Sequence, residues 1–251
     1  MYNINHTDFF ILGIIFNMTE IGEQITHPIY IEQSSEIDGL PSCRLSTTPV
    51  SYPEAVAEME AHIEAMRTGE CGELLWFLEH PPLYTAGTGA QESDLLSPQK
   101  LPVFKSGRGG QFTYHGPGQR VVYVMLDLNQ RGRDVRQFVK QLQNWIIHAL
   151  NECGLETRAD NTHIGVWVDR PDLGEKRADK VAAIGIRLRK WMSFHGISIN
   201  VSPDLTHFSG IVPCGITDQN VTSLKALGMN ISMAELDEAL IKTFQTSFEI
   251  N

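Results

Sequence analysis

Residues 108–119 read Arg-Gly-Gly-Gln-Phe-Thr-Tyr-His-Gly-Pro-Gly-Gln and form the densest local signal in the chain. Four glycines and a proline interrupt a run of side chains that can donate hydrogen bonds. Glycine lets the backbone approach a ligand closely and adopt positive φ, while proline fixes its own φ. The segment therefore predicts a preformed, ligand-contacting loop that leads into a strand at residues 121–126. A purely structural glycine-rich turn would give the same pattern.

A second feature is Cys214, which lies at a predicted turn between Pro213 and Gly215. A nucleophilic thiol needs exposure, nearby backbone N–H groups and a positive neighbour that lowers its pKa. The remaining cysteines lack this setting. Cys71 lies in an acidic run, and Cys153 falls at the end of an amphipathic helix, where packing is the usual role. Cys214 is therefore the candidate nucleophile.

With several further motifs, these two features resemble the lipoyl(octanoyl) transferase family. Its members move an octanoyl group from acyl carrier protein to a lysine of lipoate-dependent enzymes. The acceptors are the lipoyl domains of 2-oxoacid dehydrogenases and the glycine cleavage H protein. The resemblance runs from about residue 52 to about residue 224. Besides residues 108–119, it is carried by residues 79–87 (EHPPLYTAG), 165–168 (GVWV), 180–187 (KVAAIGIR), 195–200 (HGISIN) and 213–215 (PCG).

The resemblance implies roles for individual residues. The catalytic cysteine falls on Cys214, and the lysine that lowers its pKa falls on Lys180, 34 positions earlier. No metal and no cofactor is implied, because the acyl donor is octanoyl-acyl carrier protein. The substrate-contacting segments fall on Arg108, Gly109, Gly110, Gln111, Phe112, Thr113, Tyr114 and His115, on Ala183, Ile184 and Gly185, and on Gly196, Ile197 and Ser198.

The residues around Lys180 agree with this role. Lys180 opens an apolar segment, residues 181–186, whose β-branched side chains suit a buried strand. Partial desolvation favours the neutral amine, which can share a proton with a nearby thiol. Attraction between ammonium and thiolate, and proton transfer from thiol to amine, both fit the sequence. A solvated lysine at a strand end also remains open.

An octanoyl chain needs an apolar slot, in which each buried methylene contributes about 0.8 kcal/mol. The small residues within 183–185 and 196–198 are expected to leave a groove between sheet and loop. Tyr114 and His115 are candidates to close its mouth or to orient the carbonyl. His80 is expected to support the loop, with substrate contact as the alternative.

Length and composition fit one domain, since 251 residues with 42% hydrophobic content can bury a full core. We expect an N-terminal extension at residues 1–48, disordered or packed on the domain, and a single catalytic domain at residues 49–251. The apolar run at residues 9–16 is too short to span a bilayer and lacks the charged flank of a signal peptide. The cysteines show no paired framework, so we expect a cytoplasmic protein without membrane association.

Charge is unevenly distributed along the chain. The net charge is −10, yet residues 101–190 hold 15 basic and 9 acidic residues, a net charge of +6. Acidic partners such as acyl carrier protein and lipoyl domains would be steered to this third, unless it is only a solvated face. No nucleic-acid-binding motif accompanies the basic residues, so nucleic acid is not an expected partner. The residues available for steering are Arg131, Arg133, Arg136, Lys140, Arg187, Arg189 and Lys190.

Periodicity predicts an α+β fold with a mixed, largely antiparallel sheet and packed helices. Through the resemblance, this fold is similar to the biotin/lipoate ligase catalytic domain. Helices are predicted at residues 53–68, at 134–152 with Asp134 as N-cap, and at 232–246 with a capping box formed by Ser232 and Glu235. Strands are predicted at residues 74–78, 84–85, 121–126, 164–168, 181–188 and 197–201.

Three other functions fit parts of the pattern. A lipoate or biotin ligase would activate the free acid with ATP and survive Cys214→Ala. A thiol hydrolase would pass the acyl group to water and release free octanoate. A noncatalytic module would bind acyl carrier protein without forming an adduct. The charged connection at residues 169–179 is longer than the family's usual one, which leaves its conformation and its effect on acceptor docking open.

Overall fold

The computed structural model describes residues 40–160, 162–175, 177–212 and 220–248, and the backbone of three short strands before residue 40. Two of these strands, β1 (Phe10–Ile11) and β2 (Ile14–Ile15), pair with each other. The third, β3 (Tyr30–Gln33), joins the main sheet through β4 (Ser42–Ser46).

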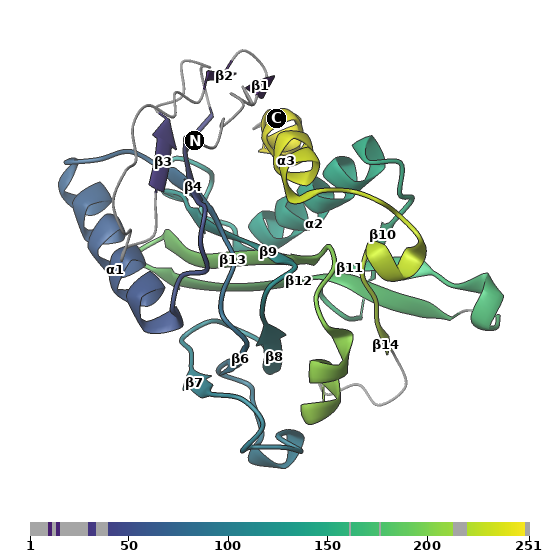
Figure 1. Ribbon diagram of the computed structural model, residues 1–251. Coiled ribbons are helices and arrows are strands. Elements are labelled where there is room, and N and C mark those ends of the chain that lie inside the picture. Colours follow the sequence, from purple (N-terminus) through teal and green to yellow (C-terminus); the bar gives the residue numbers. More distant parts are fainter. Residues whose placement is uncertain are drawn as a thin grey trace, which may run out of the picture.

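A mixed, mostly antiparallel sheet forms the centre of the molecule (Figure 1), which confirms the predicted fold class. In addition to β3 and β4, its strands are β5 (Leu74–Leu78), β9 (Gln119–Met125), β10 (Arg158–Ala159), β11 (Val166–Asp169), β12 (Ala178–Arg189), β13 (Met192–Asn200) and β14 (Asn220–Val221). Within the described ranges the order is β10-β11-β12-β13-β9-β5-β4-β3, with β14 paired to β12. The pairs β4–β5 and β12–β14 are parallel, and the other neighbours are antiparallel.

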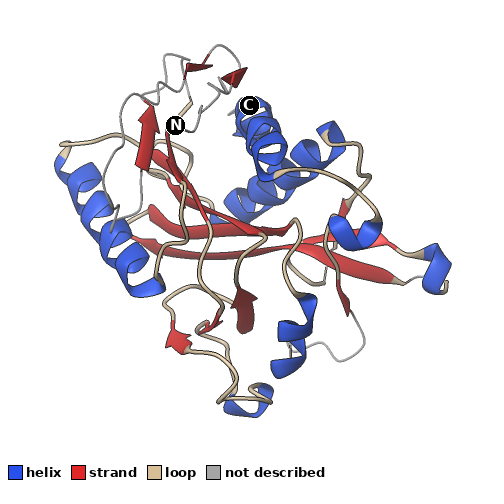
Figure 2. Ribbon diagram, viewed as in Figure 1, coloured by secondary structure: helices blue, strands red, loops and turns tan. Residues whose placement is uncertain are grey.

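Two helices, α2 (Val135–Glu152) and α3 (Met233–Phe248), cover one face of this sheet (Figure 2). Asp134 caps α2 by accepting hydrogen bonds from the backbone N–H groups of Arg136 and Gln137, as predicted. The predicted capping box of α3 is also present, since Ser232 and Glu235 bond each other's backbone N–H groups. These caps fix where the helices begin, and the helices bury the alternate residues of β9, β12 and β13.

The opposite face carries α1 (Tyr52–Thr68) and a second, three-stranded sheet. Its strands are β6 (Leu83–Ala86), β7 (Val103–Lys105) and β8 (Phe112–His115), in the order β7-β6-β8. In Figure 1 they lie below the main sheet, on the side away from α2 and α3. Short 3-10 turns complete the described elements: η1 (Glu92–Asp94), η2 (Pro171–Leu173), η3 (Leu205–Gly210) and η5 (Lys225–Leu227).

Two features of the fold differ from the sequence pattern. Residues 108–119 were predicted to be a loop, but Phe112–His115 forms β8 and pairs with β6. Phe112 and Tyr114 pack into an aromatic cluster, and this burial stabilises a strand despite the glycines on either side. In addition, β4 pairs with β5, so the main sheet extends into the segment expected to precede the catalytic domain. The apolar run at residues 9–16 lies outside the described residues except for the backbone of β1 and β2.

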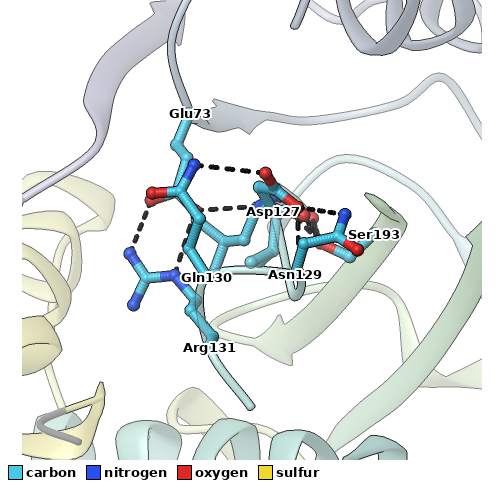
Figure 3. Close-up of polar contacts among 8 residues, drawn as sticks. Glu73, Asp127, Asn129, Gln130, Arg131 and Ser193 are labelled. Carbon is cyan, nitrogen blue, oxygen red and sulfur yellow. Dashed lines mark hydrogen bonds and ion pairs between the residues drawn. The ribbon is translucent and has the colours of Figure 1, made fainter. Parts of the chain in front are cut away.

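Polar contacts around Glu73 hold the turn that follows β9 (Figure 3). Glu73 Oε1 accepts from the Asp127 backbone N–H at 2.8 Å and from Arg131 Nε at 3.0 Å. Asp127 Oδ1 accepts from Asn129, whose amide also donates to the backbone oxygen of Lys190. These hydrogen bonds therefore connect the start of β5, the end of β9 and the turn of the β12–β13 hairpin.

Candidate active site

A cleft of about 600 Å³, partly open to solvent, lies between β12, β13 and the segment that leads into β8. The structure brings most of the sequence-predicted site residues together here: Arg108, Gly110, Gln111, Phe112, Thr113, His115, Lys180, Ala183, Ile184, Gly185, Gly196, Ile197 and Ser198. Sequence reasoning missed five further lining residues, namely Tyr52, Val121, Tyr123, Ile164 and His195. Gly109 and Tyr114 are not among the lining residues.

Lys180 is buried at this cleft, with 6% of its surface exposed. Its Nζ donates to the backbone oxygen of Ile164 at 3.1 Å and lies 4.6 Å from the centroid of the Trp167 ring. Both contacts hold the amine inside the protein, away from bulk solvent. The alternative of a solvated strand-end lysine is therefore wrong.

A β-bulge directs Lys180 toward the cleft. Val166 and Trp167 are neighbours on β11, but they pair with Ala182 and Lys180 on β12, which leaves Val181 as an extra residue. Val181 and Ala182 consequently both pack into the core beneath α2 and α3. Strict alternation would have turned Lys180 to that core, so the extra residue is what places the amine in the site.

Gly165 provides the space that the lysine side chain occupies. A Cβ at this position would lie 2.9 Å from Lys180 Cε and 3.3 Å from Nζ, and the φ of Gly165 is +142°. Its carbonyl is held by Gln143 of α2, whose Nε2 donates at 3.1 Å. Only glycine fits here without moving the amine.

Arg108 organises the loop from inside. Its guanidinium donates to the backbone oxygens of Thr85, Gly109 and Gln111, each at 2.9 Å. A Cβ on Gly185 would lie 2.8 Å from Arg108 Cδ, so the arginine fills the space that we expected this glycine to leave open. Gly185 thus permits the loop to pack closely on β12 and does not itself create a groove.

Gly196 plays a similar part on β13. A Cβ on this residue would lie 2.2 Å from the backbone oxygen of Val122 on the neighbouring strand β9. The glycine therefore permits close strand packing, and the expected open groove is not at its missing side chain. Ala183 and Ser198 face each other across β12 and β13 and line the cleft directly.

Tyr114 points away from the cleft. Its ring lies 4.9 Å from that of His207 and 5.3 Å from that of Phe208, measured between centroids. Burial, followed by the charge of Asp204, raises its pKa to about 12. Successive side chains of a strand point to opposite faces. Thr113 and His115 line the cleft, so Tyr114, which lies between them on β8, points to the other side.

Tyr123 and three histidines form the inner part of the site. His80 Nδ1 donates to the backbone oxygen of Val50 at 2.6 Å, so its Nε2 accepts from the Tyr123 hydroxyl at 2.7 Å. Burial lowers the pKa of His80 to about 4 and raises that of Tyr123 well above its usual value. His80 therefore supports a cleft residue and does not line the cleft itself.

His195 reaches the cleft through an unusual backbone conformation. Its φ is +60°, and its ring centroid lies 6.0 Å from that of Tyr123. Burial, and then the positive charge of Arg108, lowers its pKa to about 4. Alternation along β13 would have placed this ring beside Ile197 in the core, which is why the sequence pattern did not identify it.

The described cysteines have pKa values that disfavour the thiolate. Burial, together with the charge of Asp237, raises the pKa of Cys43 to about 11. Burial is also the largest cause of the raised pKa values of Cys71 and Cys153, and nearby glutamates add to it. A neutral thiol is a poor nucleophile, so these three residues are unsuited to acyl transfer.

Cys214 lies outside the described residues, as do its neighbours from 213 to 219. The described chain stops at Val212, whose backbone N–H donates to Asp94. It resumes at β14, where Asn220 pairs with Asp179 and Val221 pairs with Lys180. The strand that follows the cysteine segment therefore runs beside the cleft lysine.

The basic residues expected to steer partners are partly neutralised. Arg187 and Arg189 both pair with Glu60 of α1, at 3.2 and 2.7 Å. Arg131 pairs with Glu73, as seen in Figure 3. The strands on either side of the charged connection, β11 and β12, are antiparallel neighbours, and Arg170 pairs with Asp179 at 3.0 Å.

Over the described ranges, no three histidine, cysteine or acidic side chains gather in a way that could hold a metal ion. Among the described residues, no helix has the length and apolar character needed to cross a membrane.

The comparisons with known proteins agree with this fold. Residues 51–245 match the model of the lipoyl protein ligase A/B catalytic domain. The octanoyltransferase of Jannaschia sp. (strain CCS1) is 60% identical over 204 residues, which cover 79% of this chain and 94% of the relative. The octanoyltransferase of Caulobacter vibrioides is 59% identical over 204 residues, covering 81% and 90%. A bipartite lipoate protein ligase from Thermoplasma acidophilum shares the fold, with a TM-score of 0.59 and 16% identity over 81% of this chain and 82% of that chain.

The chain belongs to the lipoyl protein ligase A/B catalytic-domain family. Within that family it groups with the octanoyltransferases, and it is an enzyme of the acyltransferase class. This membership rules out the noncatalytic binding module.

Proposed function

We propose that this enzyme transfers an octanoyl group from octanoyl-acyl carrier protein to a lysine of lipoyl domains through a thioester on Cys214. The acceptors are the lipoyl domains of 2-oxoacid dehydrogenases and the glycine cleavage H protein, and the reaction takes place in the cytoplasm. Relatives of nearly full coverage are named octanoyltransferases, which supports the acyl group assigned.

The observation that carries the proposal is the setting of Lys180. The amine lies buried in a cleft, and the strand beside it, β14, directly follows the cysteine segment. A positive group beside a thiol stabilises the thiolate and can return a proton to a leaving group. The three described cysteines have raised pKa values, so Cys214 is the remaining candidate.

The chemistry proceeds in two half-reactions. In the first, the Cys214 thiolate attacks the thioester carbon of the donor, the donor C–S bond breaks, and Lys180 gives a proton to the departing phosphopantetheine thiolate. In the second, the acceptor amine attacks the enzyme thioester, Lys180 takes the proton that the nitrogen loses, an amide forms, and the C–S bond breaks so that Cys214 leaves as a thiolate. The first exchange is nearly isoenergetic because one thioester replaces another, whereas amide formation drives the second forward.

The test is intact-protein mass spectrometry after mixing the enzyme with octanoyl-acyl carrier protein and no acceptor. We expect one octanoyl mass on Cys214, located by peptide mapping, and its loss on adding a lipoyl domain. Cys71→Ala is the matched control, because this thiol is partly exposed but has a raised pKa, and the substitution should leave the adduct unchanged.

Three results would contradict the proposal. The adduct could be absent, it could appear on Cys71, or Cys214→Ala could retain activity with ATP and free octanoate, as expected of a ligase. Release of free octanoate at the rate of transfer, without an acceptor, would instead identify a thiol hydrolase.

A further inference from the structure

The cleft contains a histidine whose proton position is set by a chain of hydrogen bonds behind it. His115 Nδ1 lies 2.7 Å from Gln119 Oε1. Gln119 Nε2 donates to Asn200 Oδ1 at 2.9 Å, and Asn200 Nδ2 donates to the backbone oxygen of Thr222 at 3.0 Å. A backbone oxygen can only accept, so it fixes the orientation of both amides and makes Gln119 an acceptor toward the ring.

The proton of His115 is therefore on Nδ1, and the lone pair is on Nε2. Within the part of the chain that the structure describes, Nε2 has no hydrogen-bond partner, and the ring lines the cleft with 9% of the residue exposed. Burial is the largest cause of a pKa well below the usual histidine value, and the neighbouring His80 and Arg108 lower it further. The ring is thus neutral near pH 7 and presents a hydrogen-bond acceptor to the cleft.

An acceptor suits one reacting group of octanoyl transfer in particular. The carbonyl oxygen gains negative charge and needs donors, and the departing thiolate needs a proton. The acceptor lysine differs, because after losing one proton its amine still has two N–H bonds. Those bonds must be oriented so that the nitrogen lone pair faces the thioester carbon.

We propose that Gln119 and Asn200 hold His115 as a hydrogen-bond acceptor for the attacking amine of the acceptor lysine. The inference rests on the thioester route of the proposed function. In this step the nitrogen bonds to the acyl carbon, the C–S bond breaks, and the sulfur leaves with the electron pair. The proton that the amine releases passes to Lys180, and the sulfur leaves as a thiolate. His115 accepts a hydrogen bond throughout and takes no proton.

His115→Asn separates the two functions of the ring. The asparagine amide nitrogen can replace Nδ1 and still donate to Gln119, but nothing replaces Nε2. We expect transfer from the isolated octanoyl-enzyme to a lipoyl domain, at saturating acceptor, to slow by about tenfold or more. Adduct formation from octanoyl-acyl carrier protein, followed by rapid-quench mass spectrometry, should stay within about twofold of wild type.

Two more variants complete the experiment. Gln119→Leu removes the bond that orients the ring, so it should slow transfer in the same direction. His148→Asn is the matched control, because His148 is an exposed histidine of α2 that bonds Ser247, and both half-reactions should remain unchanged. Thermal unfolding at the wild-type midpoint verifies that each variant is folded.

Equal slowing of both half-reactions in His115→Asn would overturn the inference, because the ring would then serve the acyl donor or only the fold. An unchanged transfer rate would overturn it as well. A wild-type enzyme that forms no adduct would give a different result: it would refute the thioester route itself, and the inference would fall with it.

Discussion

At the scale of single residues, the position of the cleft amine depends on a neighbour that has no side chain. Gly165 and Gly174 both have φ values near +140°, at +142° and +137°. A Cβ on Gly165 would press on Lys180, whereas a Cβ on Gly174 would meet nothing within 4 Å. The two glycines therefore share the backbone strain of a substitution but differ in what the new methyl group touches.

We predict that Gly165→Ala lowers the rate of octanoyl transfer about tenfold to a hundredfold, since a displacement of about 1 Å in a reacting group has effects of this size. Gly174→Ala should retain the wild-type rate and lose only stability. Steady-state transfer assays and thermal unfolding of both variants make the comparison. Similar rates in the two variants would show that crowding of Lys180 has no part in the effect.

The resemblance of the sequence to a known family identified Lys180, but the direction of its side chain could not be predicted. Alternation along a strand assigns each residue to a face, and the bulge at Val181 breaks that alternation. The positive φ of His195 does the same on β13. Such local irregularities depend on pairing with distant residues, so a periodicity taken from one segment does not contain them.

At the scale of secondary-structure elements, a buried ion pair joins β9 to α3. Arg120 Nε and Nη2 donate to the two carboxylate oxygens of Asp237 at 2.8 and 3.0 Å, and both side chains are almost fully buried. Breaking one half of such a pair leaves an unpaired buried charge. The pair therefore fixes where α3 lies on the sheet.

We predict that Asp237→Asn lowers the free energy of unfolding by about 3–5 kcal/mol, measured by chemical denaturation. The double variant Arg120→Met with Asp237→Leu should recover most of this loss, because neither charge remains to be desolvated. A loss as large in the double variant as in the single one would mean that packing, and not the unpaired charge, is responsible.

The same pair gives stability a dependence on pH. Burial is the largest cause of the Asp237 pKa of about 6, against 3.8 for the ordinary group. The folded chain thus binds this proton more tightly than the unfolded chain. The stability that this tighter proton binding contributes is fully present below pH 3.8 and is lost as the pH rises through about 6. Asp237→Asn should remove this part of the slope.

The elements differed in how well the sequence predicted them. The apolar run of β5 gave the observed bounds, and the capping residues of α2 and α3 gave their first turns. Strand β8 was missed because flanking glycines indicate a loop, while its stability comes from an aromatic cluster formed by distant residues. Strand β4 has little alternation of its own and is defined by its pairing with β5.

At the scale of the whole molecule, charge affects how partners approach. Glu60 of α1 pairs with both Arg187 and Arg189, which belong to β12, one of the strands that line the cleft. An acidic donor such as acyl carrier protein would be attracted more strongly if these arginines were unpaired. Glu60 therefore limits the positive field on this side.

We predict that Glu60→Gln lowers the KM for octanoyl-acyl carrier protein by about two- to fivefold at low ionic strength, with the difference vanishing near 1 M salt, where charges are screened within about 3 Å. Glu152→Gln is the matched control, because it frees Lys242 on the opposite, helical face by the same change in charge. Equal shifts in both variants would indicate a nonspecific effect of net charge.

The general layout of the molecule followed from the sequence through the family resemblance, and the family comparison confirms the fold. The roles of individual site residues could not be predicted from the sequence in the same way. Arg108 and Tyr114 both belong to the predicted contact segment, but Arg108 holds the loop by hydrogen bonds and Tyr114 packs in the aromatic cluster. Neighbours in sequence point in opposite directions on a strand, so one continuous motif contains both contact residues and structural residues.

The extra valine in β12 also has a consequence for protein engineering. Anyone who transplants this lysine onto another sheet would have to copy the surplus residue along with it, because a regular strand would present the amine to the wrong layer. In this enzyme the position of the cleft amine is set by the residue count of the strand, and not by the lysine alone.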